Sequence, residues 1–202
     1  MRSMPRTTAF RSAAALLAIG ATIAAVATAG PVTAQNVDLK PIRDPQNRFT
    51  INVPASWNVT IQTKNPTVQA KSAVPKATLP DSLDVTVYDW TKAISAQDCI
   101  AESDLVLRFA IHTWTTVRQG PETIGGQPAY SRVYNWRAGS EPRQSVETCI
   151  THGNRVYVAV GTTDNTTAKV NSTMPLLQRS IATLEPNLGN TPATQPNPGG
   201  KD

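Results

Sequence analysis

The chain contains short runs in which apolar and polar residues alternate, the pattern of strands with one buried face. The run at residues 48–53 places Phe49 and Ile51 on one side, and Pro54 ends it. The run at residues 82–90 has apolar residues on both sides, which is typical of a strand covered on both faces. The pattern predicts seven strands, at residues 48–53, 58–63, 82–90, 112–119, 127–137, 143–150 and 155–161.

Turn-forming residues separate the last four of these strands. Gly125 and Gly126 allow positive φ angles and are typical of a two-residue β-hairpin. Residues 138–140 and 152–154 contain Gly with Ser or Asn and predict two further turns. We therefore expect the last four strands to form an antiparallel meander. Residues 65–80 are rich in Pro, Lys and Ala without a clear period, which predicts a loop or an extended insertion.

Residues from Ser95 onward have the period of a helix and not that of a strand. Ser95 followed by Asp98 is an acidic variant of the capping box that begins helices. Ala101, Leu105 and Phe109 recur at four-residue spacing. We expect these three side chains to form the apolar stripe of this helix.

The last element, at about residues 164–184, repeats its apolar residues at intervals of four, three, four and three, as an amphipathic helix does. Those residues are Val170, Met174, Leu177, Ile181 and Leu184. Pro175 lies inside this span, where a proline removes a helical hydrogen bond. Two interpretations agree with the sequence: Pro175 kinks a long helix, or it lies in the first turn of a shorter helix that begins near Ser172 or Thr173.

The N-terminus has the three parts of a secretory signal peptide. Arginines without any acidic residue precede an alanine-rich apolar run at residues 13–29, and the small residues Val32, Thr33 and Ala34 follow a Gly-Pro pair. The sequence predicts cleavage after Ala34, with a retained anchor as the alternative, although a bilayer span needs about 20 apolar residues. Because Gln35 and not cysteine follows, no lipid anchor is expected, and the mature protein is predicted to be soluble and either periplasmic or secreted.

Removal of residues 1–34 changes the charge of the protein. The full chain has 19 basic and 14 acidic residues, and three of the basic ones lie in the signal peptide, so the mature chain is nearly balanced. No cluster of five Lys or Arg residues occurs, so nucleic-acid binding is not expected. Residues 187–202 are rich in Pro and Gly and are predicted to be a disordered tail. One globular domain is therefore expected at residues 38–186.

Cys99 and Cys149 are the two cysteines of the chain. An even number of cysteines in an exported protein favours a disulfide. This bond would close a loop of about 50 residues and stabilise the fold by about 4 kcal/mol. The alternative is a reactive thiol with a histidine partner, either His112 or His152. Because the sequence places neither histidine beside a cysteine, we expect the structural disulfide.

Three short motifs stand at separate places along these elements: Phe49, Ile51, Val53, Pro54 and Trp57; Gly125, Gly126, Gln127, Pro128 and Ala129; Ser180 and Ile181. With the order of the elements, they resemble the PsbP-like α/β/α sandwich family, which includes exported bacterial lipoproteins. The resemblance covers nearly all of residues 38–186 and implies an α+β fold in which helices flank an antiparallel sheet. It also implies a binding or accessory module, although a fold alone does not determine function.

The sequence contains no recognisable catalytic motif and no metal-binding motif. It has no G-x-S-x-G around a serine nucleophile, and Asp81 and Asp84 near a loop are too few for a metal site. No cofactor is therefore expected. Arg132, Tyr134 and Trp136 alternate on one predicted strand. On an exposed face they would form a recognition patch, because these residue types dominate binding surfaces; the alternative is that they belong to the core.

Two functional classes agree with the sequence. The first is an exported, non-catalytic binding or accessory module of the bacterial cell envelope or extracellular space. Its partner would be an envelope or extracellular protein, a glycan or a small apolar ligand. The second is a small extracytoplasmic hydrolase that uses a serine outside any recognised motif. The sequence predicts no stable membrane anchor after cleavage and leaves the oligomeric state open.

Overall fold

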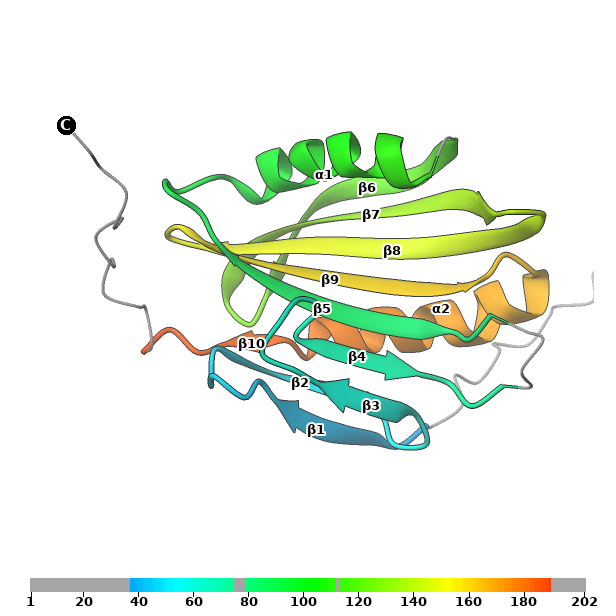
Figure 1. Ribbon diagram of the computed structural model, residues 1–202, viewed down its shortest axis with the longest axis horizontal. Coiled ribbons are helices and arrows are strands. Elements are labelled where there is room, and N and C mark those ends of the chain that lie inside the picture. The colour runs from blue at the N-terminus through cyan, green and yellow to red at the C-terminus, as the bar shows by residue number, and fades with distance from the viewer. Residues whose placement is uncertain (1–36, 75–78, 112, 190–202) are drawn as a thin grey trace, which may run out of the picture. The chain divides into compact units, whose positions relative to one another are not determined.

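The computed structural model describes residues 37–74, 79–111 and 113–189, which form two helices and ten strands (Figure 1). The helices are α1 (Ala96–Ala110) and α2 (Thr167–Ala182). The strands are β1 (Leu39–Arg43), β2 (Phe49–Pro54), β3 (Asn58–Ile61), β4 (Val68–Lys71), β5 (Ser82–Asp89), β6 (Trp114–Ile124), β7 (Gln127–Ala138), β8 (Glu141–His152), β9 (Arg155–Asp164) and β10 (Glu185–Pro186). The predicted signal peptide, residues 190–202 of the predicted tail and His112 lie outside the described residues.

Seven strands form one antiparallel sheet in the order β3-β4-β5-β9-β8-β7-β6. The strands β6, β7, β8 and β9 are successive neighbours, so the predicted meander is confirmed. Gly125 and Gly126 have φ angles of 55° and 73° and join β6 to β7. A Cβ atom on Gly125 would lie 2.7 Å from the carbonyl oxygen of Leu184, so the turn needs glycine for space as well as for its φ angle.

The helices lie on opposite faces of this sheet. The α1 helix packs against β7 and β8, whereas α2 packs against β8 and β9 on the other face. A second, three-stranded sheet, in the order β1-β2-β10, contacts α2 through β2. Figure 1 shows the resulting layers, with α1 outermost on its side of the large sheet. The protein therefore has the predicted α+β fold, an antiparallel sheet flanked by helices.

Successive side chains of β8 point to opposite faces of the sheet and contribute to two separate apolar cores. Val146 and Ile150 belong to the main core together with Leu177 of α2, whereas Cys149 lies in a smaller cluster under α1. Gly161 of β9 allows α2 to approach the sheet closely. A Cβ atom there would lie 3.0 Å from Leu177 Cβ and 3.1 Å from Val146 Cγ1. The position of α2 therefore depends on the absence of a side chain at this point of β9.

The sequence pattern missed β1, β4 and the two-residue β10, and it ended β6 too early. The β4 strand lies in the predicted loop at residues 65–80, and its two buried apolar residues are too few to show a period. The β1 strand has no fully buried residue and contains Pro41, which is tolerated at a sheet edge. The β6 strand continues past Gln119 through Gly120 and Pro121, residue types that usually end a strand.

The α2 helix decides between the two interpretations of Pro175. It begins at Thr167, with Thr166 as its N-cap, so Pro175 lies in the helix interior and not in a first turn. Proline cannot donate to the carbonyl of Asn171, one turn earlier. Both residues are exposed, so solvent can satisfy that carbonyl.

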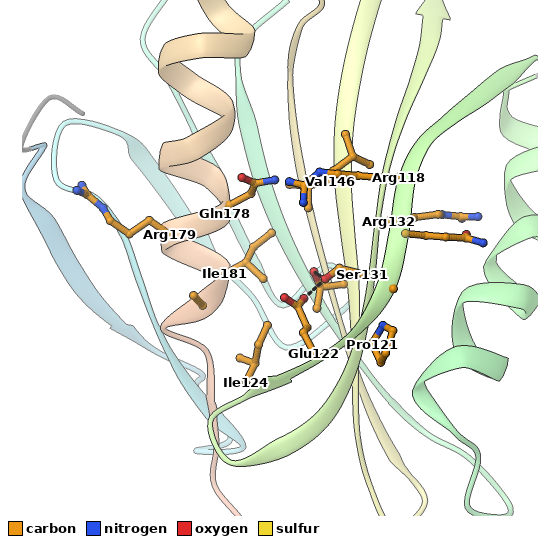
Figure 2. Close-up of a pocket in the computed structure, with 15 residues that line it drawn as sticks. Arg118, Pro121, Glu122, Ile124, Ser131, Arg132, Val146, Gln178, Arg179 and Ile181 are labelled. Carbon is orange, nitrogen blue, oxygen red and sulfur yellow. Dashed lines mark hydrogen bonds between the residues drawn. The ribbon is translucent and has the colours of Figure 1, made fainter. Parts of the chain in front are cut away.

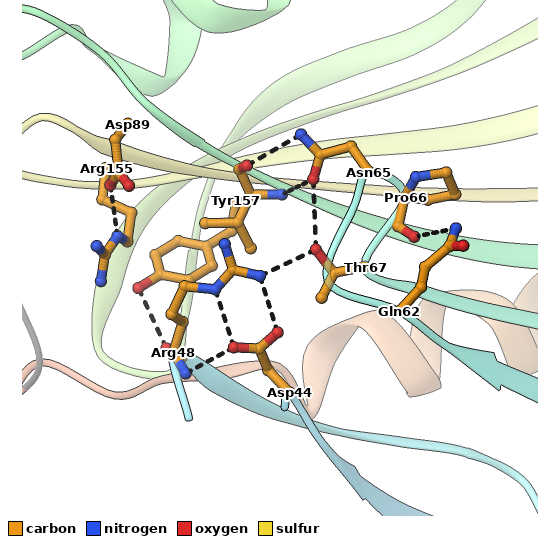
Figure 3. Close-up of polar contacts among 10 residues, drawn as sticks. Asp44, Arg48, Gln62, Asn65, Pro66, Thr67, Asp89, Arg155 and Tyr157 are labelled. Carbon is orange, nitrogen blue, oxygen red and sulfur yellow. Dashed lines mark hydrogen bonds and ion pairs between the residues drawn. The ribbon is translucent and has the colours of Figure 1, made fainter. Parts of the chain in front are cut away.

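A buried ion pair fixes the turn between β1 and β2 and connects the two sheets (Figure 3). Arg48 donates to the Asp44 carboxylate through Nε and Nη2, each at 2.9 Å, and the Asp44 side chain is fully buried. Arg48 Nη2 also donates to Thr67 Oγ1 at 3.1 Å, and the Tyr157 hydroxyl donates to the Arg48 carbonyl oxygen at 3.2 Å. Thr67 precedes β4 and Tyr157 lies on β9, so this ion pair holds the small sheet against the large one.

The stability of the protein is expected to fall in acid through Asp44. Burial raises the pKa of the Asp44 carboxyl, but the hydrogen bonds and charge of Arg48 outweigh burial, so the pKa lies below its ordinary value of 3.8. A lowered pKa stabilises the fold above the unfolded-state value, and this contribution is lost as pH falls through the folded-state value. Asp44→Asn should therefore lower the free energy of unfolding by about 3 kcal/mol at neutral pH. Urea unfolding should show a smaller difference at about pH 3.

Asp38→Asn is the matched control for this experiment, because Asp38 is exposed. This variant should match the wild type at both pH values. An Asp44→Asn protein as stable as the wild type at neutral pH would contradict the assigned role of the ion pair.

Candidate binding site

One face of the large sheet is only partly covered. The α2 helix lies over β8 and β9, and the outer strands β6 and β7 extend beyond it on that face. A groove of about 510 Å³ lies between α2 and the strands β6, β7 and β8 (Figure 2). This volume is in the range of sites for small ligands, which is about 300–1,000 Å³.

The floor of the groove is apolar and rigidly packed. Ile124 of β6, Val133 of β7, Val146 of β8 and Ile181 of α2 line it, and each is at least nine-tenths buried. These side chains meet because Ile124, Val133 and Val146 alternate onto the α2 face of their strands. The groove is therefore an extension of the main core that the protein leaves open on one side.

The rim of the groove is polar and carries charges of both signs. Arg118 and Glu122 lie four residues apart on the same face of β6, and both are exposed. Figure 2 shows Arg118 and Gln178 pointing toward one another from β6 and α2. Ser131 of β7 donates a hydrogen bond to the Glu122 carboxylate. A molecule in the groove would thus meet an apolar floor, a guanidinium near one end and a carboxylate with a hydroxyl near the other.

Gly120 keeps the groove open on the β6 side. It lies between Arg118 and Glu122, and a Cβ atom built on it would meet nothing within 4 Å. Its φ angle is outside the positive range that disfavours side chains, so this position tolerates other residues. The space beside Gly120 is free because glycine has no side chain, so a larger residue at this position would fill it.

The sequence did not reveal this groove. The predicted strand stopped at Gln119, so Arg118, Gly120, Glu122 and Ile124 were not recognised as one alternating face. The signal that would have shown it is the hairpin at Gly125, because a two-residue turn requires strands that reach it from both sides.

The predicted patch of Arg132, Tyr134 and Trp136 is not an exposed surface. The three residues share one face of β7, but Arg132 is 2 % exposed and Tyr134 is 3 % exposed. That face lies under α1, and Arg132 donates to Glu147 Oε2 through Nε at 2.9 Å and through Nη2 at 2.7 Å. Asp104 of α1 also pairs with Arg132. The hypothesis of an exposed patch is therefore wrong for Arg132 and Tyr134, because α1 and a buried ion pair cover them.

Burial and pairing also set the charge states under α1. Burial lowers the pKa of Arg132, but the charges of Glu147 and Asp104 outweigh it and raise the pKa above its ordinary value. Burial, reinforced by the charge of Glu147, raises the pKa of Tyr134, so this phenol stays neutral. The Arg132 guanidinium lies 5.1 Å from the centre of the Tyr134 ring, a distance that allows a cation–π contact.

Trp136 is half-buried and lines a second, smaller groove of about 280 Å³. Its indole N–H donates to Ser145 Oγ at 2.9 Å, which fixes the ring. Trp114 lies opposite Trp136 in the β6–β7 register, and Asn135 and Arg137 complete this side of the groove. Trp136 therefore borders this second groove, whereas Arg132 is among the residues that line the first one.

The other candidate residues have structural partners. Cys99 of α1 and Cys149 of β8 form the predicted disulfide, so neither is a free thiol. His152 Nδ1 lies 3.1 Å from Gln127 Oε1, across the β7–β8 end of the sheet. Asp81 accepts from Thr163 and Lys169, each at 2.7 Å. Asp84 accepts from Gln69 at 2.7 Å.

Two further observations apply to the part of the chain that the structure describes. No group of three or more His, Cys, Asp or Glu side chains converges there as metal ligands do. Within the same ranges, neither helix has the length and apolar character needed to cross a bilayer.

Solved structures of similar fold come from bacteria and from yeast. Cyanobacterial PsbP from Synechocystis has a TM-score of 0.58 and 12 % identity, with 80 % of this chain and 99 % of that chain covered. The chain has the PsbP-like fold. LpqN, involved in cell envelope biogenesis of Mycobacterium tuberculosis, has a TM-score of 0.51 and 14 % identity, with 75 % and 92 % covered. Mog1p, a Ran-binding protein of Saccharomyces cerevisiae, has a TM-score of 0.52 and 11 % identity, with 74 % and 95 % covered.

The PsbP-like resemblance inferred from the sequence is thus confirmed at the level of the fold. No protein-family model matches the sequence, and no curated protein matches it. The function of this PsbP-like chain must therefore be argued from its own residues, because one fold serves many functions.

Proposed function

We propose that the protein is an exported, non-catalytic binding module that holds a small amphipathic ligand in the groove between α2 and β6, β7 and β8. The observation that carries this proposal is the pairing of a buried apolar floor, which includes Val133 and Ile181, with the exposed charges of Arg118 and Glu122. The apolar part of a ligand would displace water from the floor. A polar or charged group would bind at the rim, where it keeps access to solvent.

The proposed place of action is the cell envelope or the extracellular space. The signal-peptide pattern at residues 1–34 supports export. The Cys99–Cys149 disulfide suits an oxidising compartment. The fold shared with LpqN, a protein of cell envelope biogenesis, agrees with this location.

The groove offers little support for the alternative of a serine hydrolase. Ser131 is the serine of the groove, and its hydroxyl donates to Glu122. No imidazole or thiol is among the described side chains that line the groove. A serine nucleophile needs a positioned base of suitable pKa, most often histidine, and donors for the oxyanion. A binding function needs neither.

The test is native mass spectrometry of the protein recovered from the secreted or envelope fraction of its own host. The expected mass begins at Gln35, is lighter by two hydrogens because of the disulfide, and carries a non-covalent adduct. A bare mass would contradict a stably bound ligand. A covalent adduct on Ser131 after treatment with a fluorophosphonate probe would contradict the proposed binding module and favour the serine hydrolase.

Filling the groove should weaken ligand binding without unfolding the protein. Gly120→Trp places an indole in the open space beside Gly120, so the affinity for the recovered ligand should fall about tenfold or more. Titration of the purified variants by isothermal calorimetry measures this change.

Thr123→Trp is the matched control, because Thr123 is an exposed residue of the same strand on the opposite face, outside the groove. This variant should bind as the wild type does. An equal loss of ligand affinity in both variants, or no loss of affinity in Gly120→Trp, would show that the ligand binds elsewhere.

A further inference from the structure

The outer surface of α1 is apolar where the helix is expected to be polar. Leu105 is 53 % exposed, Val106 is 67 % exposed and Phe109 is 89 % exposed. Leu105 and Phe109 belong to the apolar stripe that the sequence predicted for this helix, and the structure leaves that stripe exposed. We call Leu105, Val106 and Phe109 the outer stripe of α1. Figure 1 shows α1 as the outermost element on its side of the sheet, with no described element over it.

The outer stripe faces away from the sheet because the inner side of α1 is held by polar contacts. Ser103 and Asp104 point toward the sheet and bind the pair formed by Arg132 and Glu147. Near the start of the helix, Cys99 is bonded to Cys149 of β8. These contacts fix the rotation of α1 about its axis, so the outer stripe cannot turn inward.

Exposure of three large apolar side chains on one helix face marks an interaction surface. Single exposed apolar residues are normal in soluble proteins, but a contiguous patch costs free energy unless a partner covers it. The inner face of α1 buries Ala96, Cys99 and Ile100 near the start of the helix, but beyond them it carries a serine and a carboxylate, whereas the outer face carries leucine, valine and phenylalanine. In this later part of the helix the arrangement is the reverse of the one that a helix of an isolated domain adopts.

The charges beside the outer stripe indicate what covers it. Glu102 and Arg108 are exposed and lie three residues before and three residues after Leu105. If two copies of α1 pack antiparallel about a two-fold axis at Leu105, Glu102 of one copy lies level with Arg108 of the other. The exposed Ala101 then lies level with Phe109 of the second copy, so that a small side chain faces the largest residue of the outer stripe. A parallel pair would instead bring like charges together.

We propose that α1 is a homodimer interface, in which the outer stripes of two copies pack antiparallel with Leu105 on the two-fold axis. A two-fold interface requires a surface that is complementary to itself, and the opposite charges on either side of Leu105 meet this requirement. One helix pair buries less surface than a standard interface. The dissociation constant is therefore expected to be on the order of 10 µM.

Sedimentation equilibrium of the mature chain, residues 35–202, from low to high micromolar concentration tests the dimer. The wild type should change from monomer to dimer across this range. Phe109→Ser should raise the dissociation constant about tenfold or more, because it removes the most exposed apolar side chain. Tyr88→Ser is the matched control, since Tyr88 is a 47 % exposed aromatic residue on β5, and it should dimerise as the wild type does.

Charge reversal tests the antiparallel register. Glu102→Lys or Arg108→Glu alone places like charges level with one another and should weaken the dimer. The double variant restores opposite charges and should recover the wild-type dissociation constant to within about threefold.

A wild type that stays monomeric at all concentrations overturns the proposal, and so does a dimer that Phe109→Ser leaves intact. A double variant no better than the single ones overturns the antiparallel register. If the protein instead stays monomeric and binds lipid vesicles or a host protein through Phe109, the outer stripe is an interface for that partner and not for a second copy of the chain. Circular dichroism of each variant shows that it is folded.

Discussion

Replacing Arg132 with methionine is expected to lower the free energy of unfolding by about 4 kcal/mol. Arg132 and Glu147 lie opposite one another on β7 and β8, and their side chains are 2 % and 3 % exposed. Arg132→Met leaves the Glu147 carboxylate buried without its cationic partner. An unpaired buried charge loses its hydration without compensation, which is among the most destabilising changes that a single substitution makes.

Urea unfolding measures this loss, and a second variant separates the charge from the packing. Arg132→Met combined with Glu147→Leu removes both charges, and replacing a buried ion pair with apolar residues is often neutral or stabilising. The double variant should therefore be more stable than Arg132→Met alone. Arg137→Met is the surface control, because Arg137 is an exposed arginine on the same strand, and it should change stability by less than about 1 kcal/mol. A single variant as stable as the wild type would show that water reaches Glu147.

Several of the strands that the sequence predicted have one continuously apolar face. Phe49, Ile51 and Val53 of β2 are almost fully buried, and the hairpin at Gly125 and Gly126 needs its positive φ angles. Such features are local, so the sequence shows them directly. The β4 strand is different, because its four residues form a strand only between β3 and β5. Nothing in a run of that length shows the neighbours that stabilise it.

The exposure of the apolar stripe of α1 could not be predicted for a different reason. Periodicity identifies the apolar side of a helix, but the side that is buried depends on what the sheet presents beneath it. Here β7 and β8 present Arg132 and Glu147, so α1 binds through Ser103 and Asp104. The same alternation that grouped Arg132 with Tyr134 could not show that α1 covers both. The sequence left both an exposed patch and the core open for Arg132 and Tyr134, and the structure buries them, whereas it exposes the apolar stripe predicted for α1.

Removing the disulfide is the second change with a large expected effect. Cys99→Ala with Cys149→Ala should lower the free energy of unfolding by about 4 kcal/mol, because the bond closes a loop of about 50 residues in the unfolded chain. For a domain of this size the melting temperature should fall by about 10 °C. Thermal unfolding under non-reducing conditions measures the change. Ile100→Val is the control, because it removes one methyl group from the same apolar cluster and leaves the disulfide intact. This variant should lower the free energy of unfolding by about 1 kcal/mol.

The disulfide also has a local consequence that hydrogen exchange can detect. Without it, α1 is held by a small apolar cluster that includes Ile100 and Val156 and by the contacts of Ser103 and Asp104 with Arg132. The amides of Ala96–Ala110 should therefore lose protection before those of β8 and β9, which keep their neighbours in the sheet. Equal loss of protection in α1 and β8 would mean that the helix and the sheet open as one unit. Since the outer stripe of α1 depends on the same attachment, the disulfide variant should also dimerise less well than the wild type.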